Sequence, residues 1–216
     1  MFLADAIQQT SDVYSPTHPD VGLLSMRLGE ALQMLNRPAE AATAYRAAVT
    51  ALRRSVGDEH PDVGAALFHL ARLAVSTADS ETLAFVRRES APLVKSAQTL
   101  PADHPHRSGL LLLHGFIEMH TGDPEAAEAP LRECIAIRQR TLGPDHRITA
   151  YAQTVLGECL ARQGRFEEAE ARLVMYVPRV EAKYIPGSFM SADSRQRLVQ
   201  LYTAWGKPDQ AEAARR

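Results

Sequence analysis

The chain has 216 residues, of which 45% are hydrophobic and only 6% aromatic, and its formal net charge is −2. This charge argues against a general nucleic-acid-binding protein, whose domain is usually basic, so we expect no nucleic-acid partner. No apolar run approaches the roughly 18 residues of a membrane span, and we expect no membrane insertion. The start of the chain shows no signal peptide.

A short phrase, HPDVG, occurs twice, at His18–Gly22 and at His60–Gly64, and the two histidines lie 42 residues apart. Weaker copies follow at His104 and His146, and a further step of 42 residues reaches Ser188. A period of 42 to 44 residues over the whole chain is an internal repeat. We call these five residues, from His18 to Ser188, the anchors, and count positions within each repeat from them.

The residues after each anchor predict an amphipathic first helix. In the first repeat, for example, Leu24, Leu28 and Leu32 recur at helical spacing. The proline after the anchor suits the first helical position, where its missing N–H group is not needed. Either Thr17 or His18 is expected to act as the N-cap.

A second helix is expected to follow the first in each repeat. Eighteen residues after the anchors stand Asn36, Ala78, Gly122, Gly164 and Gly206. All of these except the alanine are residues that favour a helix end. Eleven residues after three of the anchors stands a glycine, at Gly29, Gly115 and Gly157. Such small residues let the backbones of two helices cross closely. Each repeat is therefore predicted to be an antiparallel helix hairpin.

The pattern L-G-x-x-L followed by G-R-x-E-E-A-E resembles that of tetratricopeptide repeats, and the segment Gly143–Leu173 carries it most fully. The 42-residue period and the linkers similar to GPDHPDV resemble the long subtype found in kinesin light chains and many bacterial proteins. The closing stretch, RQRLVQLYTAWGKPDQAEAARR, resembles the last repeat of the region that follows the kinase domain in many bacterial serine/threonine kinases.

The resemblance implies an all-α fold, a right-handed superhelix of helix hairpins that forms a single solenoid over residues 1–216. Residues 1–14 are interpreted as the orphan second helix of a preceding repeat, which suggests that the chain is one piece of a longer protein. The repeats are expected at residues 15–57, 58–101, 102–143, 144–185 and, incomplete, 186–216.

No sequence motif indicates catalysis, so we expect neither an enzyme nor a cofactor. The chain lacks the phosphate-binding loop G-x-x-x-x-G-K-[ST], the zinc motif H-E-x-x-H, paired C-x-x-C and the nucleophile motif G-x-S-x-G. The repeated histidines lie one per repeat, so they are expected to be spread along the array rather than to bind a metal ion together. Cys134 and Cys159 stand at apolar positions and are expected to be buried free thiols.

In tetratricopeptide-repeat proteins the first helices line a concave face, and the resemblance places partner binding there. The predicted groove residues are Phe68, Arg72, Leu112, Leu113, Phe116, Met119, Glu158 and Arg162. Exposed apolar side chains would supply the anchors of a contact site, and the two arginines would favour a ligand with acidic residues. An open alternative is that the first helix of the third repeat is apolar because its neighbours bury it.

The predicted function is a non-catalytic protein–protein interaction scaffold that binds a peptide or partner protein in this groove. The paired asparagines with which kinesin light chains hold a peptide backbone are missing, since Asn36 is the only asparagine. Two alternatives stay open: a sensing regulatory region of a bacterial signalling protein such as a serine/threonine kinase, and a self-association module that forms a homodimer. The expected location is cytoplasmic, or the cell-envelope side for the C-terminal part of a membrane-anchored kinase.

Overall fold

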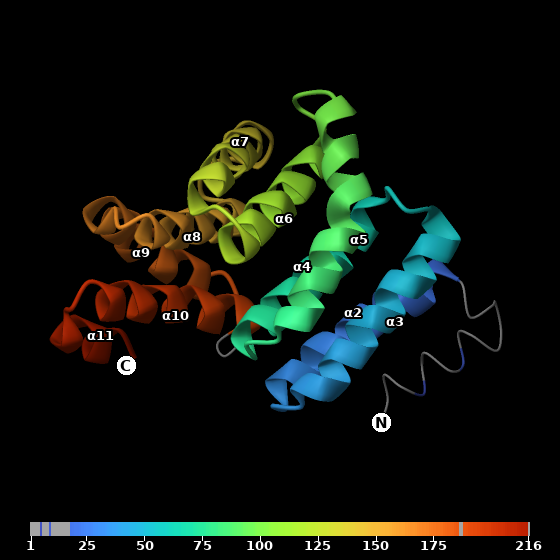
Figure 1. The fold of residues 1–216 in the computed structure, drawn as a ribbon, viewed down its shortest axis with the longest axis horizontal. Helices are drawn as coiled ribbons and strands as arrows, with labels where there is room; N and C mark the ends of the chain where they lie inside the picture. The colour runs from blue at the N-terminus through green and yellow to red at the C-terminus, as the bar shows by residue number, and fades with distance from the viewer. Residues whose placement is uncertain (1–4, 6–8, 10–17, 186–187, 216) are drawn as a thin grey trace. The chain divides into compact units, whose positions relative to one another are not determined.

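The computed structural model describes residues 5, 9, 18–185 and 188–215, and all the regular secondary structure of these residues is α-helical (Figure 1). The helices are α2 (Pro19–Met34), α3 (Pro38–Val56), α4 (Pro61–Ser76), α5 (Ser80–Thr99), α6 (Pro105–Thr121), α7 (Pro124–Leu142), α8 (Arg147–Arg162), α9 (Phe166–Glu181), α10 (Phe189–Ala204) and α11 (Pro208–Arg215). The predicted all-α class is confirmed. The orphan helix expected in residues 1–14 lies outside the described residues, apart from residues 5 and 9.

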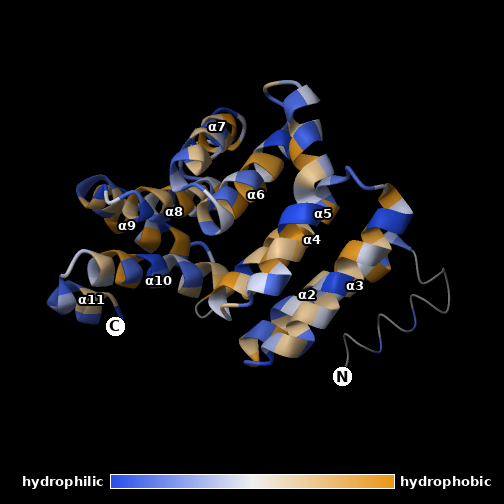
Figure 2. Cartoon of the chain, viewed as in Figure 1, coloured by the Kyte–Doolittle hydropathy of each residue, from blue (hydrophilic) through white to orange (hydrophobic). Residues whose placement is uncertain are grey.

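The chain forms two compact units, residues 1–100 and residues 101–216. In the first unit, α2 pairs with α3 and α4 pairs with α5, and α3 also packs against α4. In the second unit the pairs are α6 with α7, α8 with α9 and α10 with α11. In this unit α7 also packs against α8, and α9 packs against α10. The helices carry hydrophobic stripes, seen in orange in Figure 2, as amphipathic helices do.

The anchor histidines start the first helices of four hairpins. The Nδ1 atom of each ring accepts a hydrogen bond from the backbone N–H group two residues further on. The donor–acceptor distances are 3.3 Å at His18, 3.2 Å at His60, 3.3 Å at His104 and 3.4 Å at His146. Of the two N-cap candidates in the first repeat, His18 is the cap, and Thr17 lies outside the described residues. The repeated phrase is thus a helix-start signal.

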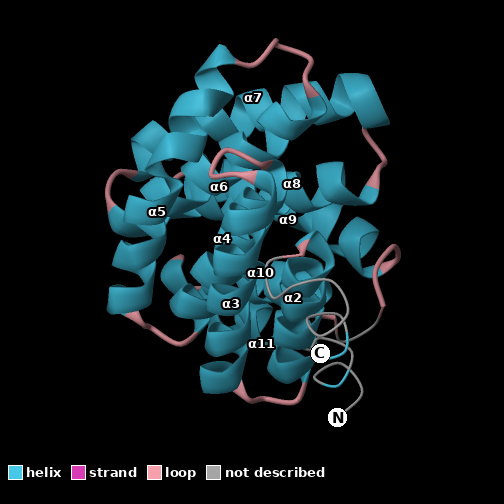
Figure 3. Cartoon of the chain, turned by 90° about the vertical axis from the view of Figure 1, so that its right-hand side faces the viewer, coloured by secondary structure: helices cyan, strands magenta, loops and turns pink. Residues whose placement is uncertain are grey.

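Most of the first helices end through a residue with positive φ, eighteen residues after the anchor. The φ angle is 55° at Asn36, 54° at Ala78, 76° at Gly164 and 72° at Gly206. Gly122 departs from this pattern, with a φ of −150°. Ala78 adopts the left-handed conformation without being glycine, at a cost of roughly 1 kcal/mol. The short loops that result from these helix ends are drawn in pink in Figure 3.

Two glycines of the first helices show why the hairpins need small residues. A Cβ atom added at Gly29 would lie 2.5 Å from the ring of Tyr45, and one added at Gly157 would lie 2.7 Å from the side chain of Leu173. Atoms at these distances overlap, so the two helices of each hairpin approach closely only because the glycine has no side chain. The predicted close crossing of the backbones is therefore correct at both places.

The middle of the second unit is the most enclosed part of its core. Every residue of α8 from Thr149 to Leu160 is buried. This segment includes polar side chains, notably Gln153, Thr154 and Glu158. Because a buried polar group must be hydrogen-bonded or paired to avoid a large energetic cost, α8 is where a polar cluster with a defined geometry is expected.

Candidate functional site

The predicted groove residues lie on first helices, but most of their side chains are buried. Phe68 and Arg72 lie on α4 in the first unit, whereas Leu112, Leu113, Phe116 and Met119 on α6 and Glu158 and Arg162 on α8 belong to the second unit. The exposed fraction is 8% or less for all of them except Arg162. The side chain of Arg162 is 40% exposed. The apolar residues are thus packed inside the protein, and a role for them in partner binding stays a prediction.

Glu158 is the centre of a buried charge cluster that links the first helices of the second unit. Its Oε1 atom lies 3.2 Å from Nε2 of His120 on α6 and 3.2 Å from Nε of Arg162, one turn further along α8. Its Oε2 atom accepts a hydrogen bond of 2.8 Å from Nε of Arg197 on α10. We call these four residues the Glu158 cluster. The side chains of Glu158, His120 and Arg197 are each less than a tenth exposed.

The other nitrogen atoms of Arg197 are also satisfied. Its Nη2 atom lies 2.8 Å from Oδ2 of Asp193, and it donates to the hydroxyl of Tyr151 at 3.3 Å. Its Nη1 atom donates to the hydroxyl of Thr154 at 3.4 Å. The guanidinium also lies over the ring of Tyr151, 5.0 Å from the ring centroid. Each nitrogen of this buried arginine therefore has an acceptor, which limits the cost of its burial.

The charges of the cluster keep one another ionised. Burial alone would raise the pKa of Glu158, but the close contact with His120 and the positive charges of Arg197 and Arg162 lower this pKa well below its usual range. Burial alone would lower the pKa of Arg197, but the negative charge of Asp193, the hydroxyl of Tyr151 and the negative charge of Glu158 raise it. General acid–base catalysis needs a pKa near the working pH. Glu158 and Arg197 are thus arranged as a permanent ion pair and not as proton-transfer groups.

The first unit has a weaker version of this pair at the equivalent positions. Glu30 follows its anchor by twelve residues, as Glu158 does, and His69 follows its own anchor by nine residues, as Arg197 does. The Oε1 atom of Glu30 lies 3.6 Å from Nε2 of His69, and its Oε2 atom accepts a hydrogen bond of 2.9 Å from Arg27. The carboxylate thus faces a histidine in the first unit and an arginine in the second.

The surroundings of His69 oppose its protonation. Its ring stacks on the ring of Tyr45, with the centroids 5.5 Å apart. Burial, and then the positive charge of Arg72, lower the pKa of His69 to about 3. His69 is therefore neutral at pH 7, and its contact with Glu30 lacks the charge attraction present between Glu158 and Arg197.

The groove prediction includes Glu158 and Arg162 but does not pair Glu158 with His120 or Arg197. The sequence does carry a signal for the pairing of Glu158 with Arg197. The carboxylate residue at position twelve is followed, 39 residues later, by a basic residue at position nine of the next repeat, both at Glu158 and at Glu30. His120 has no such counterpart in the other repeats, and only the packing of α6 on α8 brings it to the cluster.

The described residues contain no group of three or more His, Cys, Asp or Glu side chains that could hold a metal ion. Within the same part of the chain, none of the helices has the combination of length and hydropathy required to cross a bilayer. Cys134 and Cys159 are buried free thiols, as expected. Burial raises the pKa of both thiols, that of Cys159 to about 11, so neither is a reactive thiolate.

Comparisons with known proteins agree with this architecture. Two family models, both described as tetratricopeptide repeat, match residues 26–62 and residues 107–182. A kinesin-light-chain-type protein of Podosopora anserina with nearly identical TPR-like repeats has a solved structure with a TM-score of 0.58 and 22% identity, over 91% of this chain and 92% of that chain. BtubC (BKLC) from P. vanneervenii matches with a TM-score of 0.53 and 16% identity, over 98% of this chain and 83% of that chain. A comparison with curated proteins gives no match.

At these identities the likeness to solved structures concerns the fold. The family matches fall in both units of the chain, and tetratricopeptide repeats indicate a protein–protein interaction scaffold. The helix hairpins, the glycines at their crossings and the 42-residue period agree with these matches. The chain is therefore a tetratricopeptide-repeat protein, and its fold is similar to that of the kinesin-light-chain-type repeat protein.

Proposed function

We propose that this chain is a non-catalytic scaffold that binds a peptide, or a segment of a partner protein, along its first helices, with Arg162 as an anchor for a carboxylate. The observation that supports this proposal is the state of Arg162. Its Nε atom donates to Glu158 at 3.2 Å, while its side chain is 40% exposed. No acceptor for its Nη atoms is found among the described residues. These N–H groups remain available to a partner, and a guanidinium binds carboxylates well.

The Glu158 cluster prepares Arg162 for this role. Glu158 is itself bound by His120 and Arg197 on two neighbouring helices, so its carboxylate is a fixed support for the guanidinium. A side chain that is already held in place loses less conformational entropy when a ligand binds. An arginine in this setting therefore binds a carboxylate more tightly than a mobile surface arginine does.

Other carboxylates on the first helices of the second unit also favour a particular kind of ligand. Asp193 on α10 and Glu118 on α6 are both only partly buried, and each carries a carboxylate on a first helix of the second unit. These groups repel a uniformly acidic segment. The ligand that fits best has one acidic residue, for Arg162, among neutral or basic neighbours.

Fluorescence anisotropy with labelled ten-residue peptides tests this proposal. Each peptide carries a single glutamate in a neutral or basic context, and a matched peptide carries glutamine instead. The glutamate peptides should bind the parent chain more tightly than the glutamine peptides. Arg162→Gln should weaken the binding of the glutamate peptides by about tenfold, because one charge-assisted hydrogen bond is lost. The buried Phe116 is unsuitable for this test, because its truncation would disturb the packing of α6.

Arg140→Gln is the matched control, because Arg140 is an exposed arginine of α7, paired with Asp103 away from the Glu158 cluster. This variant should bind the peptides as the parent does. Equal affinity of the glutamate peptides for the parent and for Arg162→Gln would contradict the proposed anchor. Equal weakening by the two substitutions would show a general attraction between charges instead of a site.

The two alternative functions predict different experimental results. A self-association module predicts a dimer in sedimentation equilibrium, with a dissociation constant that Arg162→Gln leaves unchanged. A regulatory region of a signalling protein predicts that peptide binding alters the activity of an effector domain in the same polypeptide. A chain that stays monomeric and binds the glutamate peptides through Arg162 favours the scaffold.

A further inference from the structure

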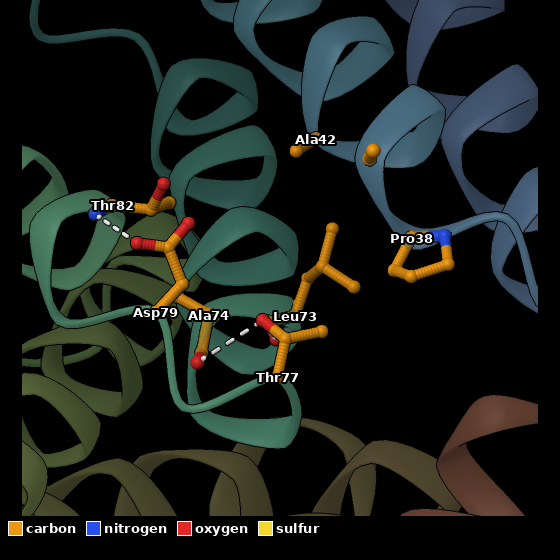
Figure 4. A pocket seen from close by; sticks show the side chains of 8 residues that line it. Pro38, Ala42, Leu73, Ala74, Thr77, Asp79 and Thr82 are labelled. Carbon is orange, nitrogen blue, oxygen red and sulfur yellow. Dashed lines mark hydrogen bonds between the residues drawn. The ribbon is translucent and has the colours of Figure 1, made fainter.

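A cavity of about 260 Å³ lies in the first unit, where α3, α4 and the start of α5 meet (Figure 4). In the figure, Pro38 and Ala42 stand on one side of it and Asp79 and Thr82 on the other, with Leu73 between them. One wall is therefore apolar and the opposite edge is polar. The cavity is smaller than the pockets that hold drug-sized ligands, and its size suits a single side chain.

The equivalent place in the second unit is filled. Counted from the anchors, Pro124 on α7 corresponds to Pro38 on α3, and Gln163 at the end of α8 corresponds to Thr77 at the end of α4. The Nε2 atom of Gln163 donates a hydrogen bond of 2.9 Å to the backbone carbonyl oxygen of Pro124. The thiol of Cys159 donates to the same oxygen at 3.1 Å. The second unit thus closes this interface with its own side chains.

A salt bridge completes the closure in the second unit. The Nη1 atom of Arg165 lies 2.7 Å from Oε2 of Glu128 on α7. The corresponding residues of the first unit are Asp79, in place of the arginine, and Ala42, in place of the glutamate. A carboxylate thus stands where the second unit has a guanidinium, and a methyl group stands where it has the opposing carboxylate. No such salt bridge can form in the first unit.

The polar groups of the first unit do not fill the space either. The hydroxyl of Thr77 turns back to its own helix and donates to the carbonyl oxygen of Leu73 at 2.9 Å. Asp79 is the N-cap of α5, where its Oδ1 atom accepts a hydrogen bond of 2.9 Å from the N–H group of Thr82. Arg46, a nearby cation, donates to the hydroxyl of Thr82 at 2.8 Å and lies over the ring of Phe85. These bonds leave the apolar wall of the cavity uncovered.

We propose that this cavity binds an arginine side chain of a partner protein. The aliphatic stem would lie on the apolar wall formed by Ala42 and Leu73. The guanidinium would supply both groups that the second unit provides for itself, namely an N–H donor for the carbonyl oxygen of Pro38 and a positive charge for Asp79. A guanidinium has five N–H donors, so it can bind both acceptors at once. The inference rests on the proposed scaffold function only in taking the arginine from a partner.

The cavity is tested on the full chain with small probes: n-butylguanidinium, the neutral n-butylurea of similar shape, and the oppositely charged butyrate. A two-dimensional ¹H–¹⁵N NMR titration follows the backbone amides from Thr77 to Thr82. Butylguanidinium should shift these signals in a saturable way, more tightly than butylurea, and butyrate should leave them unchanged. Thr77→Gln, which places the side chain of Gln163 at the equivalent position, should remove the binding.

Asp79→Asn separates the charge from the helix cap, because asparagine is as good an N-cap as aspartate. This substitution should weaken the binding of butylguanidinium by about tenfold, which is the usual effect of losing a charged acceptor. Asp123→Asn is the matched control, since Asp123 is the N-cap of α7 and accepts from the N–H group of Glu125 at 2.9 Å. This control should bind the probe as the parent does.

Three results would each overturn the inference: binding of butylurea or butyrate as tight as that of butylguanidinium, unchanged binding to Asp79→Asn or Thr77→Gln, or the absence of saturable shifts at the six amides. A thermal melt of each variant checks that it is folded. None of these results would affect the proposed anchor at Arg162, which lies in the second unit and is tested with acidic peptides.

Discussion

The interface between α3 and α4 in the first unit and that between α7 and α8 in the second are built from equivalent positions, yet they are closed to different degrees. In the second unit, Gln163 and Arg165 reach across to α7. In the first, the shorter Thr77 and Asp79 leave a cavity of about 260 Å³. Both interfaces nevertheless join a second helix to the first helix of the next hairpin. The long polar side chains are therefore not what produces the fold.

The first helices repeat the same contrast. A buried carboxylate, that of Glu158, meets Arg197 in the second unit, and a partly buried one, that of Glu30, meets the neutral His69 in the first. Glycines at the helix crossings and the histidine caps occur in both units. Small residues and caps thus specify the hairpins, while the polar side chains determine how firmly neighbouring hairpins are joined.

The largest expected effect is the loss of Arg197. Arg197→Met would leave Glu158 and Asp193 without the cation that they share in the core, and breaking a buried ion pair in this way costs about 3–5 kcal/mol. The equivalent change in the first unit, His69→Met, removes a neutral ring and should cost about 1 kcal/mol. Urea denaturation followed by circular dichroism measures both. A cost for Arg197→Met no larger than that for His69→Met would contradict the difference between the two pairs.

A change of pH should weaken the first unit before the second. The pKa of His69 is about 3 in the folded chain and 6.5 ordinarily, so between these values the unfolded state takes up a proton that the folded state does not. Stability therefore falls as the pH falls, by about 2 kcal/mol at about pH 5. Glu158 acts differently, because its folded pKa lies below the ordinary 4.5. The contribution of Glu158 to the free energy of unfolding is complete above about pH 4.5, and it is lost only as the pH falls through the lower pKa of the folded chain.

Hydrogen exchange at pH 7 and about pH 5, corrected for the intrinsic exchange rates, distinguishes the two units. The amides of α4, which contains His69, should lose protection at about pH 5, while those of α8 keep it. In a His69→Gln variant the difference should disappear. Equal loss of protection in α4 and α8, or none in α4, would contradict the assignment of acid sensitivity to His69.

The smallest expected effect is the opening of the closed interface. Gln163→Thr gives the second unit the residue of the first, and it removes the hydrogen bond to the carbonyl oxygen of Pro124. The expected loss of stability is about 1 kcal/mol. Thr77→Gln is the reverse change in the first unit and should raise the melting temperature. If the two substitutions changed the melting temperature in the same direction, the two interfaces would not be equivalent.

The hairpins could be predicted from the sequence because single residues control them locally. A glycine eleven residues after the anchor permits a close crossing, and a proline after the anchor starts a helix, whatever surrounds them. Ala78 was harder to predict, because alanine does not favour the left-handed conformation that it adopts here. The neighbouring helices, and not the residue itself, determine its backbone.

The site was less predictable because it depends on which side chains of different helices come into contact. Glu158 and His120 are 38 residues apart in the sequence, and no local pattern shows that their side chains meet. Leu113 and Phe116 look alike in the sequence whether they line an open groove or are packed inside, and the structure buries both. Exposure depends on every helix around a residue, so the apolar pattern of one helix could not decide it.

The histidine caps select one tautomer of the imidazole ring. Because Nδ1 accepts a hydrogen bond from the backbone, the exchangeable proton of a neutral ring must be on Nε2. A second proton, added to Nδ1 in acid, removes this acceptor. At His18 and His60 a carboxylate also lies near this nitrogen, since Oδ2 of Asp20 and Oδ2 of Asp62 are each 3.6 Å from it.

The caps of the second unit have no carboxylate at this position. His104 is followed two residues later by His106, and His146 by Ile148. The letters HPD therefore place a carboxylate beside the capping nitrogen of the ring, whereas HPH and HRI do not. The same cap is thus built in two electrostatic settings, one in each unit.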